Sequence, residues 1–332
     1  MSQPQPQPPQ FPDSFDEARP HLRPMLRGRW HIEMPRLQAQ IEDAHYSGHL
    51  ASMPFCQDAV VLVGYDFPDR IVQVPPEQLA IWKMTLQDAF KVAVQNLRAV
   101  SAPSFQALQG GVRVGDWQDG HDASRLLLPE VMRQCGIDDE LIMMVPSRRA
   151  GVLVAPAGSV DAQLHMLGFA RQIIEDRGGL ISAAMFRYQD RRVSVHQPAN
   201  AHLAAKLGEL QKVAASALYA EQKDLLQALH RRQRKDLFVA GYQVAQCPGA
   251  WLSACSWTQG VTALLPKTDV VSMVTLDPRG GDQHQVKILD WDVMLSLAGD
   301  RLQPVDGLFP PRFMVTGFPP EDVLARAPAA KL

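Results

Sequence analysis

The sequence predicts an α+β protein whose antiparallel sheet is built from hairpin-plus-helix units, with a second, smaller β-rich domain. Short apolar, strand-like runs come in pairs separated by turn residues, which is typical of hairpins. Segments with apolar residues at helical spacing follow these pairs in the N-terminal part of the chain. Strands joined as hairpins pair in antiparallel fashion, so the pattern does not favour a doubly wound parallel sheet.

The N-terminal segment, residues 1–34, is predicted to be disordered or extended. Residues 1–12 read MSQPQPQPPQFP and hold too few apolar side chains to order themselves. Residues 13–34 mix Pro and Arg with single apolar residues. We expect them to lie across the surface of the main domain.

An α+β domain is predicted over residues 35–198. A helix begins at Pro35, and the runs Ala59–Gly64 and Arg70–Val74 then form a hairpin. The remaining predicted elements, in chain order, are a helix that Thr85 caps, two short strands, a helix that Asp122 caps, a hairpin at Leu141–Ala155, a helix from about Ser159 to Asp176, and a hairpin at Leu180–His196.

A helical connector is predicted at residues 199–234, followed by a small β-rich α+β domain at residues 235–332. Leucines at helical spacing mark one face of the connector, which ends in a basic run. Pro and Gly punctuate the later strand-like runs, so these strands are expected to be short. If the apolar stripe at residues 203–229 is exposed, it can mediate self-association, which makes a homo-oligomer one hypothesis.

Composition and charge indicate a soluble globular protein of the cytoplasm. Hydrophobic residues make up 46% and charged residues 20% of the chain, and the formal net charge is −2. This charge gives no general attraction to nucleic acids or to anionic membranes, so neither is an expected partner. No apolar run reaches the roughly 20 residues that a membrane-spanning helix needs. The four cysteines are scattered without CxxC spacing, which is typical of reduced thiols.

Two short motifs in the middle of the chain are distinctive. Asn-Leu-Arg closes the segment Ala93–Arg98, and Asp-Gly-His-Asp-Ala-Ser-Arg opens the segment Asp119–Leu127. The hairpin sequences LIMMVPSRRAGVLVA and LISAAMFRYQDRRVSV fit the same pattern. On these residues the chain, over about 59–197, resembles the YtpQ-like family of bacterial proteins of unknown function. The resemblance implies no catalytic residues.

The candidate binding loop lies in GDWQDGHDASR and contains Asp116, Asp119, His121, Asp122 and Arg125. Carboxylates and an imidazole near a helix N-terminus can bind a cation or act as general acid and base. A structural role is the alternative, in which Asp122 caps the helix and Arg125 pairs with Asp119 or Asp122. The full ladder of oxygen ligands that a calcium loop needs is missing.

Other motifs favour no particular chemistry. His45 and His49 have the spacing of two metal ligands on a helix, but the glutamate of HExxH is missing, so we expect no metal site there. GxSxG, GxGxxG and GxxxxGK are absent from the sequence, and Cys135 is expected to be a buried thiol. We therefore expect a non-catalytic module without a cofactor that binds an unknown protein or small-molecule ligand. The alternative hypothesis is a hydrolase that uses the loop Asp116–Arg125.

Overall fold

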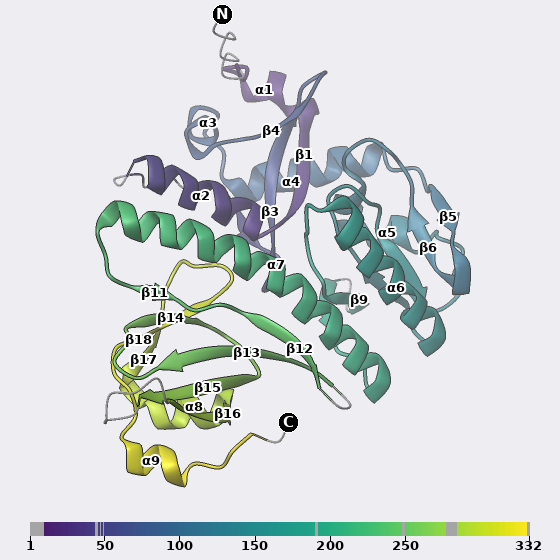
Figure 1. The fold of residues 1–332 in the computed structure, drawn as a ribbon. Coiled ribbons are helices and arrows are strands. Elements are labelled where there is room, and N and C mark those ends of the chain that lie inside the picture. Colours follow the sequence, from purple (N-terminus) through teal and green to yellow (C-terminus); the bar gives the residue numbers. More distant parts are fainter. Residues whose placement is uncertain are drawn as a thin grey trace, which may run out of the picture. The chain divides into compact units, whose positions relative to one another are not determined.

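The computed structural model describes residues 10–43, 46, 48, 50–189, 192–247, 250–276 and 284–330, and it confirms the α+β class (Figure 1). The chain divides into two compact units. Unit 1 combines Met1–Arg29 with His49–Ala204, and unit 2 combines Trp30–Gly48 with Ala205–Leu332. This division differs from the predicted boundaries, because the segment after Arg29 belongs to unit 2.

The first sheet of unit 1 is centred on β3 (Ala59–Asp66). Strand β1 (Leu22–Gly28) pairs with β3 along its whole length in antiparallel register, and β4 (Ile71–Gln73) forms the predicted hairpin with β3. Helix α4 (Leu86–Ala99) packs on β1 and β3, and the Thr85 side chain caps it by accepting the N–H of Asp88. The smaller elements around this sheet are α1 (Phe15–Ala18), η1 (Arg19–His21), β2 (Met53–Pro54) and α3 (Pro76–Ile81).

The prediction that residues 13–34 lie across the surface is wrong for β1. Leu22 and Leu26 are completely buried, because β1 supplies a strand to the sheet rather than crossing over it. Residues 1–9 of the predicted disordered tail lie outside the described residues. Pro12, at the end of the predicted tail, contacts the fold, because its carbonyl oxygen accepts the indole N–H of Trp82 at 2.8 Å. The Phe11 ring also packs edge-on against Trp82.

The second sheet of unit 1 has the strand order β10-β9-β7-β8-β6-β5, with antiparallel pairs throughout the described strands. Because side chains alternate along a strand, Val152 and Val154 face one layer while Leu153 faces the other. Helix α6 (Val160–Arg177), which Ser159 caps, covers the face that includes Leu153. The strands are β5 (Phe105–Ala107), β6 (Arg113–Gly115), β7 (Leu141–Met144), β8 (Leu153–Pro156), β9 (Met185–Gln189) and β10 (Arg192–His196), and η2 (Gln109–Gly111) joins β5 to β6.

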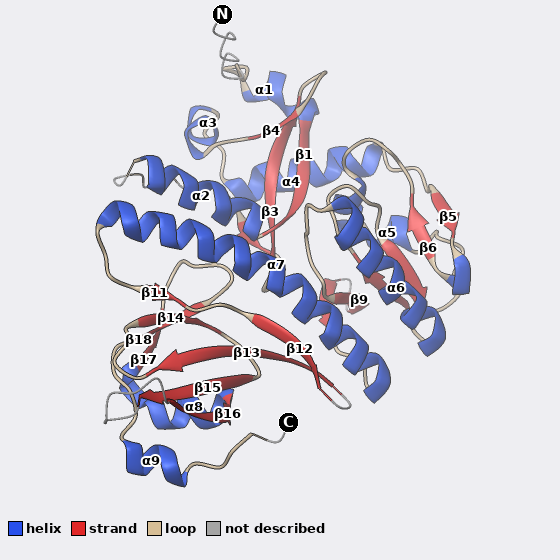
Figure 2. Cartoon of the chain, viewed as in Figure 1, coloured by secondary structure: helices blue, strands red, loops and turns tan. Residues whose placement is uncertain are grey.

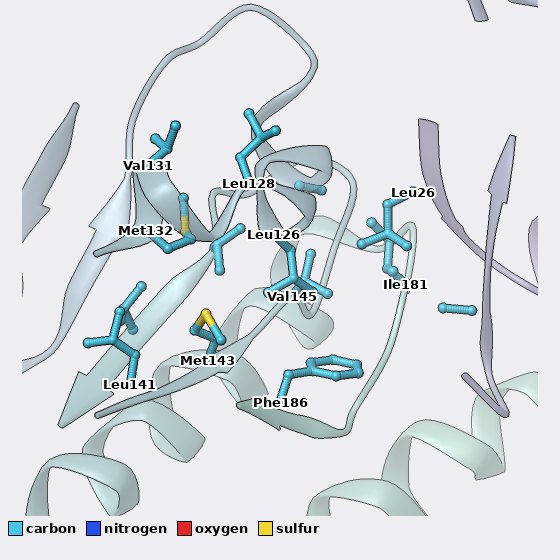
Figure 3. Close-up of a cluster of buried hydrophobic side chains, with 14 of the residues drawn as sticks. Leu26, Leu126, Leu128, Val131, Met132, Leu141, Met143, Val145, Ile181 and Phe186 are labelled. Atoms are coloured by element: carbon cyan, nitrogen blue, oxygen red, sulfur yellow. The ribbon is translucent and has the colours of Figure 1, made fainter. Parts of the chain in front are cut away.

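The opposite face of this sheet carries the main apolar cluster of unit 1. Figure 3 shows Leu126, Leu128 and Met132 in one cluster with Met143 and Phe186. The first three come from η3 (Asp122–Leu127), from the residue that follows it and from α5 (Pro129–Met132). Leu97 of α4 belongs to the same cluster and is fully buried.

The prediction of an α-helix that begins at Asp122 is wrong. The structure has the 3-10 helix η3 followed by the single turn α5. Pro129 is the physical reason, since proline disfavours the α conformation in the residue before it. Leu128 accordingly has φ −116° and ψ 80°, and it separates the two elements.

Unit 2 is built around α7 (Ala201–Gln233), a single helix of 33 residues that begins in the last residues of unit 1. Leu226 and Leu229 on α7 are buried in one cluster with Trp30 and Leu37 of α2 (Trp30–Glu42). The predicted connector is therefore a core helix of unit 2. The part of its apolar stripe that contains these two leucines is not exposed, so it does not support self-association.

Two sheets complete unit 2, in the orders β11-β14-β18-β17 and β12-β13-β15-β16 (Figure 2). Most of their pairs are antiparallel, whereas β11 with β14 and β13 with β15 are parallel. The strands are β11 (Phe238–Val239), β12 (Gln243–Cys247), β13 (Ala250–Thr258), β14 (Ala263–Pro266), β15 (Val270–Leu276), β16 (His284–Asp290), β17 (Leu302–Pro304) and β18 (Arg312–Val315), with the helices α8 (Trp291–Ala298), η4 (Gly299–Arg301) and α9 (Glu321–Arg326).

Candidate functional site

Arg125 of the candidate loop lies fully buried in unit 1, and Asp119 supplies its counter-charge. The guanidinium Nη1 and Nη2 donate to the two carboxylate oxygens of Asp119 at 2.8 and 2.6 Å, and Nε donates to Ser101 Oγ at 2.8 Å. The Trp117 ring covers the guanidinium at 4.5 Å. Of the two partners that the sequence allowed, Asp119 and Asp122, Arg125 pairs with Asp119, and this pairing engages both charged groups in a structural contact.

The pKa of Asp119 follows from this pairing. Burial of the carboxyl acts to raise its pKa, but the hydrogen bonds from Arg125 and from the backbone N–H of His121 outweigh burial. The net pKa is lower than the usual value for an aspartate. Asp119 therefore stays ionised at neutral pH and is not positioned as a general acid.

His121 also lies in the interior. Its side chain is 4% exposed, and its Nε2 lies 3.6 Å from Asp66 Oδ2, which is too long for a hydrogen bond. Burial lowers the pKa of His121, although the charges of Asp66 and Asp119 partly oppose that shift. The imidazole is therefore neutral at pH 7.

Asp122 does not cap a helix, so that part of the sequence interpretation is wrong. Its Oδ1 accepts the backbone N–H groups of Trp117 at 2.8 Å and of Gln118 at 3.2 Å. The Ser124 N–H instead donates to the carbonyl of His121 at 2.9 Å. Asp122 thus closes the loop that precedes it and holds Gln118 at a positive φ of 57°, a conformation that few side chains adopt.

Asp116 lies at the other end of this loop. Its carboxylate accepts the side-chain amides of Gln106 and Gln118, the latter at 2.8 Å. Asp116 and Asp122 are the members of the candidate loop that reach a cavity. The structure therefore separates the predicted site into a set that does not line the cavity (buried His121 and Arg125, with the partly exposed Asp119) and a cavity-lining set (Asp116, Asp122).

The cavity has a volume of about 530 Å³ and lies within unit 1, between the loop, the turn that joins β7 to β8, and the C-terminal half of α6. Its floor depends on close backbone packing. A Cβ atom at Gly151 would lie 1.8 Å from the carbonyl oxygen of Gly115, so only glycine fits there. The described apolar residues that line the cavity are Leu108, Val114, Ala150, Leu153, Phe169 and Ile173.

Charges of both signs line the cavity opposite the loop. Arg148 and Arg149 come from the turn, and Asp176 comes from the last turn of α6. Neither Arg148 nor Asp176 forms an ion pair with a side chain that the structure describes. Sequence reasoning missed all three residues. The doubled arginine in the tight turn at 146–150 was the available signal.

Cys56 and Cys135 are free thiols that are unsuited to act as nucleophiles. Burial, the charge of Asp58 and a hydrogen bond to Asp58 raise the pKa of Cys56 to about 12. Cys135 is buried as predicted, and burial raises its pKa as well. Both thiols are therefore protonated at neutral pH.

The part of the chain that the structure describes offers neither a metal centre nor a membrane-spanning helix. That part contains no group of three His, Cys, Asp or Glu side chains placed to hold a metal ion. His45 and His49 lie outside it. None of its helices is both long enough and apolar enough to cross a bilayer.

No family model, no curated protein and no solved structure matches this chain. The resemblance to the YtpQ-like family therefore stays a prediction.

Proposed function

We propose that this protein binds a small molecule in the cavity of unit 1 and does not transform it. The observation that carries the proposal is the cavity itself, whose volume of about 530 Å³ lies in the usual range for small-molecule sites. Its lining combines an apolar wall from β8 and α6 with a few charged groups at the edge. Sites of this composition bury a ligand against the apolar wall and orient it through the polar groups.

The chemistry of the lining favours binding over hydrolysis. Among the described lining residues, none is a serine, threonine, cysteine, histidine, lysine or tyrosine. The two loop carboxylates are already engaged, Asp122 by backbone N–H groups and Asp116 by glutamine amides. A hydrolase that used this loop would have to release one of them before it could accept a proton.

The distribution of charge points to a ligand that carries both a cationic and an anionic group. Asp176 lies at the C-terminal end of α6, where the helix dipole also favours a positive charge. Arg148, on the turn, provides a cation for an anionic group. A zwitterionic ligand can satisfy both ends of the cavity at once.

A thermal-shift screen of zwitterionic metabolites tests the proposal, because a ligand that binds the folded state raises its melting temperature. The variant Ile173→Trp, which fills the cavity, should abolish the shift that a confirmed ligand produces. Ile174→Trp is the matched control, since Ile174 is the adjacent isoleucine, is also half-buried, and does not line the cavity. Equal binding by the wild type and Ile173→Trp would contradict the proposed site.

Mass spectrometry of the ligand after incubation separates binding from hydrolysis. We expect the ligand to be recovered unchanged. Turnover that Asp116→Asn or Asp122→Asn abolishes would instead favour the hydrolase hypothesis.

A further inference from the structure

His121 is a buried histidine between two residues of the cavity wall. Its side chain is 4% exposed, and its Nε2 makes no hydrogen bond to any residue that the structure describes. A buried polar atom normally has a partner, because leaving it unpaired costs free energy. The neighbours of His121 in the sequence, Gly120 and Asp122, both line the cavity. Any change that moves the His121 backbone therefore moves one wall of the cavity.

Two carboxylates face the imidazole, but each of them is shared with an arginine. Asp119, on the same loop, has both of its oxygens bound by Arg125. Asp66, at the end of β3, has its Oδ2 3.6 Å from the imidazole Nε2 and 3.9 Å from Nε of Arg23 on β1. Strand β4, which lies beside Gly120, contains only uncharged residues. The surroundings therefore offer little to stabilise a positive charge on the imidazole.

Protonation of His121 is therefore unfavourable while the side chain stays inside. Burial lowers the pKa of His121, and the charge of Arg23 acts in the same direction, against the two carboxylates. A histidine in water has a pKa of about 6.5. Because the folded-state pKa lies below that value, the buried conformation keeps its full stability well above pH 6.5 and loses stability as the pH falls toward the folded-state pKa. Acid thus favours a conformation in which water reaches the imidazole.

Two hydrogen bonds fix the His121 backbone in its present position. Its N–H donates to Asp119 Oδ1 at 3.0 Å, and its carbonyl oxygen accepts the Ser124 N–H at 2.9 Å. Gly120, beside it, has a φ of 77°, a conformation that glycine adopts easily. A shift of this turn that brings the side chain into water breaks both hydrogen bonds. Exchange of these two N–H groups therefore reports whether His121 is inside or outside.

We propose that His121 is an acid-sensitive latch for the cavity: its protonation releases the turn Asp119–Asp122 from the interior and opens the cavity wall. At neutral pH the uncharged imidazole stays buried, and Gly120 and Asp122 keep their places in the wall. As the pH falls below about 6.5, release becomes easier by up to about tenfold per pH unit. The latch itself needs no ligand, whereas its consequence for binding rests on the proposed function.

Amide hydrogen exchange of the full chain tests the latch without a ligand. Rates are measured at pH 7.5 and at pH 5.5, and each is divided by the intrinsic exchange rate at that pH. Protection of the His121 and Ser124 N–H groups should fall severalfold, at most about tenfold, between the two conditions. His121→Gln, which cannot be protonated, should keep the same protection at both. His196→Gln is the matched control and should behave as the wild type, because burial also lowers the pKa of His196 in unit 1 but this residue does not line the cavity.

Asp66→Asn provides a second readout, with a change in the opposite direction. Without the charge of Asp66 a buried imidazolium is still less favourable, so acid should lower the protection by more than in the wild type. A histidine that only filled space would not give opposite changes in the two variants. If His121→Gln does not fold, Asp66→Asn carries the test, because the Asp66 side chain is 35% exposed.

Three results would overturn the inference: protection that does not depend on pH in the wild type, an acid loss that persists in His121→Gln, or greater protection in acid, which would mean that the imidazolium pairs with Asp66 inside. Failure of the proposed function is distinguishable, since the thermal-shift screen would then find no zwitterion while the protection still depends on pH. A zwitterion that does bind, and whose own charge is constant between pH 5.5 and 7.5, should bind the wild type more weakly at pH 5.5 and His121→Gln equally at both.

Discussion

Arg125 in unit 1 and Arg312 in unit 2 are both completely buried, yet their charges are accommodated in opposite ways. Arg125 faces a carboxylate. Arg312 donates to neutral oxygens instead, and the Tyr219 ring lies over its guanidinium at 5.2 Å. The acceptors of Arg312 are the side-chain oxygen of Gln222 at 2.6 Å and the carbonyls of Ala240 at 2.8 Å, Leu264 at 3.2 Å and Tyr219 at 3.2 Å.

The difference shows what each arginine holds in place. The Asp119 side chain is 37% exposed, so that pair remains partly in contact with water and secures a surface loop. Arg312 links α7 to β14 and β18 through neutral acceptors. Burial therefore lowers the pKa of Arg312 to about 10, against the opposing effects of Tyr219 and Cys255. A buried arginine by itself is therefore not a sign of function.

The largest expected effect is that of Arg312→Met. It leaves several buried acceptors without a donor, and we expect the free energy of unfolding of unit 2 to fall by about 3–5 kcal/mol. Urea unfolding followed by hydrogen exchange of individual peptides measures this, because it reports the two units separately. Arg326→Met, at an exposed ion pair on α9, is the control and should change stability little. A variant as stable as the wild type would refute the structural role of Arg312.

Arg125→Met should lower the free energy of unfolding of unit 1 by a smaller amount, roughly 1.5–3 kcal/mol. This is the range for hydrogen bonds to charged groups. The effect is smaller because the partly exposed Asp119 can be hydrated when its partner is lost. A double-mutant cycle with Asp119→Asn measures the coupling, and the double variant should lose less stability than the sum of the single variants. If Arg125→Met lowered the free energy of unfolding by more than Arg312→Met does, the comparison between the two arginines would be reversed.

The pH dependence of stability should also distinguish the two arginines. The folded-state pKa of Asp119 lies below its unfolded value of about 3.9. The contribution of Asp119 to the free energy of unfolding is therefore fully present above the unfolded pKa. It is lost as the pH falls through the folded-state pKa. Hydrogen exchange across an acid titration should show this loss in unit 1, and Asp119→Asn should remove it. Arg312 accepts no proton in this range, so Arg312→Met should leave the acid profile of unit 2 unchanged in shape.

The smallest expected effect is that of Asp122→Ala, at about 1 kcal/mol, because it removes the acceptor of two backbone N–H groups in a partly exposed loop. Asp122→Asn keeps a side-chain oxygen, so it should lower the free energy of unfolding by less than Asp122→Ala. Urea unfolding of the two variants provides the measurement. Equal stability of Asp122→Ala and the wild type would show that the loop closes without this side chain.

Local patterns in the sequence were enough to place most elements. The helix α4 with its cap at Thr85, the helix α6 and the hairpin of β7 and β8 all occur where predicted. These features depend on residues a few positions apart, namely a capping hydroxyl, a turn, and apolar spacing along one segment. The pairing of Arg125 with Asp119 is local in the same sense, since six positions separate the partners.

Tertiary contacts decided the rest. Strand β1 is a core strand because β3 pairs with it, and the Ser124 hydroxyl accepts the N–H of Leu26 across 98 positions of sequence. The cavity exists because α6 brings Asp176 to the turn that carries Arg148, and β1 can approach Leu180 because Gly28 has no side chain. Such contacts join residues distant in sequence, and their energies depend on burial and charge that arise only when the chain is folded. A single sequence therefore determined the elements of this protein, and the packing of those elements determined which charges meet.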